Sequence, residues 1–265
     1  MKHVVMFSGG VGSWAAAKRV ALRAGTRDLT LLFSDTLVED PDLYRFLNEA
    51  AENVGGTLVQ ISEGRTPWDV YRDERFLGNS RVDPCSKLLK RRPAERWLRE
   101  NTDPVDTVVY LGIDWTESHR FERTRQRRAR DGWRYEAPLC EPPFLSRLDL
   151  FRWLTREGIE TPHLYRLGFS HNNCGGFCCK AGQGHFAHLL KVLPKAFAEH
   201  EAKEESLRQF LGRDISILVD RRGKGGRHPL TLRQLRQRVE AGEFVDRYDV
   251  GGCGCFTESD DTRRE

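Results

Sequence analysis

Short apolar runs alternate with amphipathic stretches through the first half of the chain. The apolar runs are rich in Val, Leu, Ile and Phe and end at polar or glycine residues, as buried strands do. The predicted strands are residues 3–7, 28–36, 57–61 and 107–113. The predicted helices between them are residues 14–23, 41–53 and 94–100. This alternation predicts an α/β fold with a parallel, doubly wound sheet, which we assign to residues 1–140.

The pattern changes after residue 140. The helices predicted there are residues 148–157, 183–193, 196–212 and 230–241. We expect residues 141–256 to form a mostly helical, cysteine-rich metal-binding region and residues 257–265 to be a disordered tail. In the first half, residues 62–83 hold aromatic residues and arginines without a clear period, so an active-site loop is expected there.

The composition is that of a globular protein that does not enter a membrane. Of the 265 residues, 31% are charged and 38% are hydrophobic, and no apolar run approaches the length of a bilayer span. The N-terminus leads directly into a predicted strand rather than a signal sequence, so we expect a cytoplasmic protein. Seven cysteines in that compartment are expected to be thiols, metal ligands or redox centres rather than structural disulfides.

The first predicted strand runs into a loop of serines and glycines and then into a helix. Glycines let such a loop turn tightly, so that its N–H groups and the helix N-terminus point at one anionic group. Gly and Ser are also common in ordinary turns. We interpret the loop as a nucleotide-binding loop. Its residues are Ser8, Gly9, Gly10, Val11, Gly12 and Ser13.

Two other predicted strands bring candidate residues to the same edge of the sheet. Parallel sheets bind ligands beyond the carboxyl ends of their strands. Asp35 lies at the end of the second strand and Gly112 at the end of the fourth, so both are predicted to bind nucleotide. A carboxylate at this edge can accept hydrogen bonds from a ribose or an adenine amino group. The alternative is that Asp35 caps the turn before the next helix.

Positive charge is concentrated between residues 120 and 134, which hold seven arginines against two carboxylates. The net charge of the whole chain is only +4, so this local excess is the informative feature. A basic run of this kind is either a solvated helix face or a surface for polyphosphate or a nucleic-acid backbone. The predicted residues for anion or nucleic-acid binding are Lys87, Lys90, Arg123, Arg125, Arg127, Arg128 and Lys180.

Five of the cysteines lie in two glycine-rich segments. Cys174, Cys178 and Cys179 fall within six residues, and Cys253 and Cys255 within three. Glycines between thiolates allow several sulfur atoms to converge on one metal. A four-thiolate site would use Cys174, Cys178, Cys253 and Cys255, with tetrahedral zinc and an iron–sulfur cluster as the alternatives. The other interpretation is a set of buried or reactive thiols, because free Cys packs as a small hydrophobe.

Three segments resemble one known family. Residues 8–13 resemble the SGGxxS loop of the PP-loop family, the N-type ATP pyrophosphatases, which includes phosphoadenosine phosphosulfate reductase and the thiolases of nucleic-acid bases. Many members carry Asp at the fifth position, where this chain has Gly12. Residues 112–120, with Gly-Ile followed by Glu-Ser and Arg, resemble the reductase-like branch. Residues 85–93 resemble its Cys-x-x-x-Leu-Lys-x-x-Pro stretch.

This resemblance implies an adenine nucleotide alpha hydrolase-like fold that binds ATP or another adenine nucleotide, optionally with Mg²⁺. It implies that Glu117 orients the nucleotide or a metal and that Arg120 holds phosphate. Cys85 would be a catalytic sulfur carrier whose thiolate is stabilised by the lysines beside it. The resemblance also favours an iron–sulfur (4Fe–4S) cluster over zinc, with Cys85 or Cys179 as an alternative ligand.

The function implied by the resemblance is ATP-dependent sulfur transfer to a nucleic-acid base. The base oxygen is adenylated, pyrophosphate leaves, and sulfur then displaces AMP. The partners would be tRNA or DNA and a sulfur donor or reductant protein. One alternative is a phosphoadenosine phosphosulfate or adenylyl sulfate reductase, whose Glu-Cys-Gly nucleophile residues 252–255 resemble only faintly. Another is a zinc-stapled nucleic-acid-binding protein without catalysis.

Overall fold

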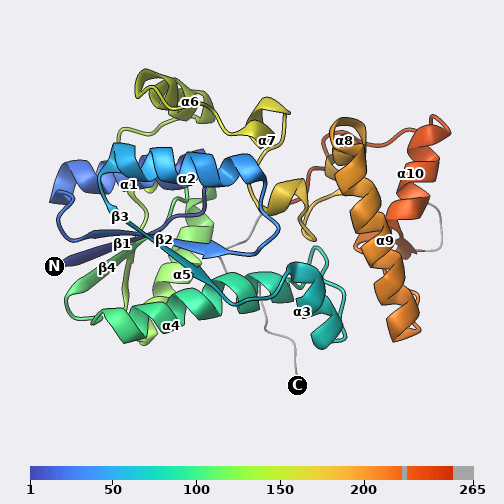
Figure 1. Cartoon of the computed structure of the whole chain (residues 1–265), viewed down its shortest axis with the longest axis horizontal. Helices are drawn as coiled ribbons and strands as arrows, with labels where there is room; N and C mark the ends of the chain where they lie inside the picture. Colours follow the sequence, from blue (N-terminus) through green and yellow to red (C-terminus); the bar gives the residue numbers. More distant parts are fainter. Residues whose placement is uncertain (223–225, 253–265) are drawn as a thin grey trace.

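A five-stranded parallel sheet lies at the centre of the computed structural model, which describes residues 1–222 and 226–252 (Figure 1). In the order β3-β2-β1-β4-β5, strand β1 is central, and Val4 pairs with Thr30 of β2 and Val109 of β4. The direction of strand addition reverses between β1 and β4, where such sheets bind ligands. The strands are β1 (Lys2–Met6), β2 (Leu29–Asp35), β3 (Thr57–Ser62), β4 (Thr107–Tyr110) and β5 (Arg134–Glu136).

Helices cover both faces of this sheet (Figure 1). Along β1 and the residue after it, Val5 and Phe7 join one apolar core, whereas Val4 and Met6 join another, as the two-residue period of a strand requires. The first core includes α1 and α2, and the second includes α4. The helices of these two cores are α1 (Val11–Ala24), α2 (Pro41–Val54) and α4 (Arg92–Asn101). The basic helix α5 (Ser118–Arg130) lies beside α4.

The second half of the chain forms a third core around Phe177, Phe186 and Phe197, which are fully buried. Helices α8, α9 and α10 gather there, to one side of the sheet (Figure 1). Helix α6 packs on α1 instead, where the ring of Trp153 lies 5.0 Å from that of Trp14. The elements are α6 (Arg147–Arg156), α7 (His163–Arg166), α8 (Gln183–Val192), α9 (Pro194–Leu211), β6 (Leu218–Asp220), β7 (His228–Leu230) and α10 (Leu232–Glu240).

The structure confirms the predicted α/β fold and differs from the sequence pattern in two places. Residues 62–83 are not one loop but contain α3 (Pro67–Asp73), because Thr66 and Asp69 form a reciprocal capping box at its start. The second difference is strand β5, which the sequence pattern does not predict because its three residues are too few to show a hydrophobic period. Cys253, Cys255 and the predicted tail lie outside the described residues.

Among the described helices, none combines the length and the apolarity needed to cross a bilayer.

Gly112 brings the end of β4 into contact with the loop that follows β1. A Cβ atom on Gly112 would lie 2.7 Å from Ser13 Cα and 2.8 Å from Ser13 N, which are backbone atoms that cannot move aside locally. We expect Gly112→Ala to lower the free energy of unfolding by about 1–3 kcal/mol, as overpacking does. Urea denaturation measures this loss. Gly252→Ala is the matched control, since no atom of the described residues lies within 4 Å of its Cβ position, and equal losses in the two variants would contradict the contact.

Candidate active site

The loop after β1 closes on itself before α1 begins. Ser13 donates from Oγ to the Gly10 carbonyl at 2.8 Å, and Gly10 is the N-cap residue of α1. Gly9 has a φ of +76°, and a Cβ there would lie 2.9 Å from the Leu43 side chain, so this turn requires glycine. The first turn of α1 holds no acidic residue. Its first N–H groups and its positive end can therefore receive an anion.

Asp35 lies at the same edge of the sheet but is engaged in a network of its own. It is buried, and it accepts hydrogen bonds from the Leu37 N–H at 2.8 Å, the Tyr44 hydroxyl at 3.0 Å and Gln60 Nε2 at 2.8 Å. Burial, followed by the hydrogen bond to Asp35, raises the pKa of Tyr44. These contacts order the chain after β2. Contact between Asp35 and a nucleotide stays a prediction.

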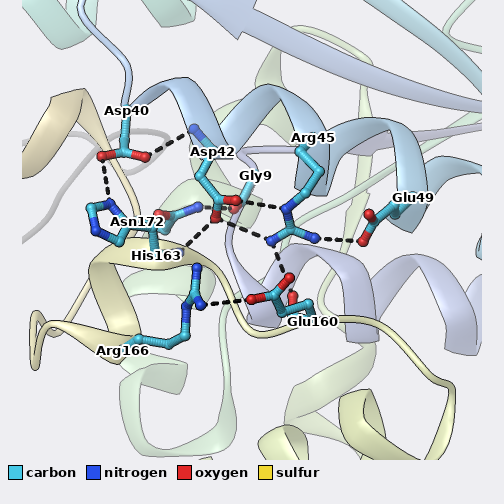
Figure 2. Close-up of polar contacts among 9 residues, drawn as sticks. All are labelled: Gly9, Asp40, Asp42, Arg45, Glu49, Glu160, His163, Arg166 and Asn172. Atoms are coloured by element: carbon cyan, nitrogen blue, oxygen red, sulfur yellow. Dashed lines mark hydrogen bonds and ion pairs between the residues drawn. The ribbon is translucent and has the colours of Figure 1, made fainter.

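A polar network fixes α7 against the start of α2 (Figure 2). Asp40 caps α2 by accepting from the Asp42 N–H at 2.9 Å, and its second oxygen lies 3.1 Å from His163 Nδ1. Asp42 accepts from the His163 N–H at 2.7 Å and from Arg45 Nε at 2.6 Å. The hydrogen bond from Arg45 is the main cause of the lowered pKa of Asp42. The same carboxylates therefore order α2 and the chain that follows α6.

That chain continues into the cysteine segment, residues 171–179, which is attached directly to residues 8–13. We call residues 8–13 the phosphate-binding loop after their predicted role. Asn172 is 1% exposed, and its Nδ2 donates to the Gly9 carbonyl at 2.9 Å (Figure 2). Asn172 Oδ1 has no hydrogen-bond partner among the described residues. The Tyr165 hydroxyl also reaches the loop, 3.1 Å from where a Cβ of Gly10 would stand. Asn172 Oδ1 is therefore a buried acceptor beside the loop that a hydrogen-bond donor from water or a ligand can satisfy.

A positive charge stands close to the loop on the same side. The Arg147 guanidinium lies 5.5 Å from the centre of the Tyr165 ring and 5.6 Å from that of Phe151, and it donates to the Phe169 carbonyl at 3.3 Å. Such ring contacts hold a guanidinium in place without neutralising it. His171 is exposed, yet the protein around it limits its hydration and, with the charge of Arg147, lowers its pKa. At neutral pH the charge of this region therefore comes from Arg147 rather than His171.

The residues predicted at the start of α5 contact one another. Glu117 and Arg120 form an ion pair at the junction between a 3₁₀ turn and the helix. Arg123, Arg125 and Arg127 are exposed on α5. Carboxylates therefore balance part of the positive charge of this run. One of the ion pairs joins α5 to α4. The partners of Arg125 and Arg128 are Glu122 and Glu95.

Four cysteines from two segments that are distant in sequence line one small cavity of about 20 Å³. Cys85 stands at the start of a π-helical turn, η1 (Ser86–Arg91), and the other three belong to the cysteine segment. A cavity of this size holds about one water molecule. The structure thus brings together residues that the sequence analysis treated as separate candidates. The cavity is lined by Cys85, Cys174, Cys178 and Cys179 together with Tyr71, Asp83, Lys90 and Lys180.

Cys85 and Cys179 are neighbours within this cavity, with their sulfur atoms 3.9 Å apart. The Tyr71 hydroxyl lies 3.2 Å from Cys85 Sγ. The hydrogen bond with Cys179, helped by the one with Tyr71, lowers the pKa of Cys85, whereas the same sulfur contact and burial raise that of Cys179. Cys85 is therefore the thiol of the pair that loses its proton more readily.

A buried ion pair supports Cys174. Lys90 Nζ lies 3.6 Å from Glu39 Oε1 and 3.8 Å from Cys174 Sγ, and Glu39 also accepts a hydrogen bond from the Cys174 N–H. The Lys90 side chain is 5% exposed, so it lies inside the protein, unlike Lys87, which is exposed. Glu39 carries no sequence signal for this role, because it reads as part of the turn before α2.

Lys180, a predicted anion-binding residue, lies at the thiol cavity, whereas Cys140 does not. Lys180 Nζ is 3.9 Å from Asp83 Oδ1 at the cavity. Cys140 lies outside the cavity, with its sulfur 3.5 Å from the Ile113 carbonyl, and burial raises its pKa to about 11. It is therefore a poor thiolate at neutral pH.

Within residues 1–222 and 226–252, no group of three or more His, Cys, Asp or Glu side chains is arranged to hold a metal ion. The thiol cavity has suitable donors, but its room of about 20 Å³ does not fit a 4Fe–4S cluster as arranged. Two of the four predicted ligands, Cys253 and Cys255, lie outside the described part of the chain. The predicted four-thiolate site therefore stays a prediction.

Residues 2–181 match the family model described as the phosphoadenosine phosphosulfate reductase domain. The chain belongs to this family. The match extends from β1 through the cysteine segment, so it includes the loop, Cys85 and the thiol cavity. It confirms the predicted relationship to the reductase-like branch of the PP-loop enzymes and the prediction that the protein is an enzyme.

The other comparisons add little to this assignment. A search of curated proteins finds no match. Among solved structures, phosphoadenylyl-sulfate (PAPS) reductase from Candida auris, in a phosphate complex, is 15% identical with a TM-score of 0.44. That match covers 64% of this chain and 80% of the other.

Asn172→Ala tests whether the cysteine segment and the phosphate-binding loop are coupled. Because the variant leaves the Gly9 carbonyl without its buried donor, we expect a loss of about 1–3 kcal/mol in local stability. Amide hydrogen exchange should become faster in residues 8–13 and 171–179 together. The control is Asn101→Ala, an exposed residue at the end of α4, which should change neither segment. Unchanged exchange in Asn172→Ala would exclude the coupling.

Proposed function

We propose that this protein is a sulfonucleotide reductase-type enzyme, which binds an adenine nucleotide carrying a 5′-phosphosulfate and reduces its sulfonyl group to sulfite. One observation carries the proposal. The hydrogen bond from Asn172 to Gly9 holds a cysteine-bearing segment on a phosphate-binding loop, inside the region that matches the family. This contact supports the proposal because it joins the predicted anion-binding loop to the segment that carries three of the thiols.

Binding of the nucleotide would rest on fixed positive groups. The N–H groups at the start of α1 and the hydroxyls of Ser8 and Ser13 would bind the phosphosulfate. Arg147 would add a guanidinium that its two aromatic neighbours already hold in place. Arg120, now paired with Glu117, is a second candidate for a phosphate oxygen.

Cys174 would be the attacking thiol. Lys90 Nζ, 3.8 Å from Cys174 Sγ, would stabilise the Cys174 thiolate. The hydrogen bond from the Cys174 N–H to Glu39 would hold Cys174 in place. The thiolate would attack the sulfonyl sulfur, forming an S–S bond while the bond from sulfur to the phosphate oxygen breaks. The nucleotide would leave with that electron pair, and the positive end of α1 would stabilise the charge that develops on its phosphate.

Cys174→Ser tests this assignment. A serine hydroxyl is a far weaker nucleophile, so sulfite release from adenosine 5′-phosphosulfate or 3′-phosphoadenosine 5′-phosphosulfate should fall by about 10³-fold or more. Nucleotide affinity, measured by calorimetry, should not change. Cys140→Ser is the matched control and should keep full activity, because that thiol lies outside the cavity. Undiminished sulfite release in Cys174→Ser would refute the role of Cys174.

A second candidate is ATP-dependent sulfur transfer to a nucleic-acid base with an iron–sulfur cluster. Its support is that four thiols, which are suitable cluster ligands, line one cavity, although this cavity would have to widen to hold a cluster. Cys174 and Cys178 would hold the cluster with Cys253 and Cys255, and the exposed arginines of α5 would contact tRNA or DNA. The cluster would supply the sulfur-transfer chemistry, and the loop of α1 would hold the pyrophosphate of ATP.

This second candidate predicts metal content and a different product. Protein purified without oxygen should contain iron and acid-labile sulfide, and Cys174→Ala should lose both together with stability. ATP should yield pyrophosphate when a nucleic-acid substrate is present. Protein without iron and without pyrophosphate release would exclude this function, and stoichiometric zinc would identify the cysteines as a structural staple.

A further inference from the structure

We propose that Cys85 and Cys179 form a dithiol–disulfide couple that supplies the two electrons of the reduction from within this chain. The couple's role in turnover rests on the reductase function proposed above. Formation of the disulfide itself does not, because it can be measured without any substrate. The inference starts from the positions of the two sulfur atoms.

The two thiols are arranged for bond formation. Their sulfur atoms are 3.9 Å apart and already in hydrogen-bond contact, whereas a disulfide requires about 2.05 Å. Both line the same cavity, so no other side chain has to be crossed for the two sulfur atoms to meet. They come from segments 94 residues apart in sequence, the turn at η1 and the cysteine segment, so a disulfide would link these two segments covalently.

The two sulfur atoms differ in their exposure and in their hydrogen-bond partners. Cys179 is 2% exposed and lies inside the core, whereas Cys85 is only partly buried. Cys85 also contacts the Tyr71 hydroxyl at 3.2 Å, a donor that stabilises negative charge on its sulfur. Cys85 is therefore the sulfur that attacks, and it is also the one that an external reductant reaches first.

The step balances with Cys174 as the first acceptor. After Cys174 has taken the sulfonyl group, the Cys85 thiolate attacks Cys174 Sγ, and the S–S bond to the sulfonate breaks. Sulfite leaves with the electron pair. Cys179 then attacks Cys85 Sγ, which releases Cys174 as a thiolate and leaves a Cys85–Cys179 disulfide. The two thiols lose two electrons and two protons, and the sulfonyl sulfur gains the two electrons. An external dithiol restores the couple.

All three sulfurs needed for this relay line the same cavity. Cys178 lines this cavity too, so other pairs of its cysteines share the same space as Cys85 and Cys179. The 3.9 Å contact is the reason for this choice.

The disulfide is tested on the full chain without substrate. Reduced protein is equilibrated at a series of glutathione redox ratios, alkylated and digested, and its cross-linked peptides are identified by mass spectrometry. We expect a Cys85–Cys179 linkage that dithiothreitol reverses, while Cys140 is alkylated at every ratio. A linkage of Cys85 to Cys174 or Cys178 instead, or none at all, would overturn the proposal. The proposal would also be overturned if the purified protein contained bound metal and if both Cys85→Ser and Cys179→Ser lost that metal.

The role in turnover is tested in a single turnover without added thiol. Wild-type protein should release sulfite from a sulfonucleotide, and Cys85→Ser should release it at least about tenfold more slowly. Cys179→Ser should still release sulfite but should stop as a Cys85–Cys174 disulfide, because Cys179 acts only after sulfite has left. Cys140→Ser should match the wild type. A disulfide without sulfite release would count against the reductase function and leave the couple intact. Full sulfite release in Cys85→Ser, or no Cys85–Cys174 disulfide in Cys179→Ser, would overturn the couple and leave the reductase function intact.

Discussion

One buried hydrogen bond, from the Asn172 side chain to the Gly9 carbonyl, joins the phosphate-binding loop to the cysteine segment. The phosphate-binding loop belongs to the α/β sheet, whereas the cysteine segment leads into the core of the second half. Because both partners are buried, separating them would leave polar groups without water or protein partners. The carboxylates of Asp40 and Asp42 hold α7 in place ahead of this bond.

The arrangement also separates the charges that the proposed chemistry brings together. A phosphosulfate and a thiolate are both negative and repel each other unless each has its own positive partner. The start of α1 and Arg147 stand on the nucleotide side. Lys90 stands on the thiol side, where Glu39 holds it inside the protein. The reacting groups can therefore approach without either losing its counter-charge.

The sequence predicts those parts of the site that depend on local pattern. The glycines of the loop, the strands around it and the lysine beside Cys85 each carry a signal in a short stretch. Glu39, Asn172 and the pairing of Cys85 with Cys179 do not, because each depends on contacts between residues that are far apart in the chain. The predicted metal site joins two cysteine clusters, of which the second lies outside the described residues, and the structure places Cys85, the alternative ligand, beside the first cluster.

The central claim is that a thiol beside the phosphate-binding loop reacts with the sulfur of a bound sulfonucleotide. The most direct measurement is to mix reduced protein with the sulfonucleotide, quench with acid within one turnover, and locate the added sulfonate by peptide mass spectrometry. The account predicts a sulfonate on Cys174. A sulfonate on another cysteine, or none with either sulfonucleotide, would contradict it.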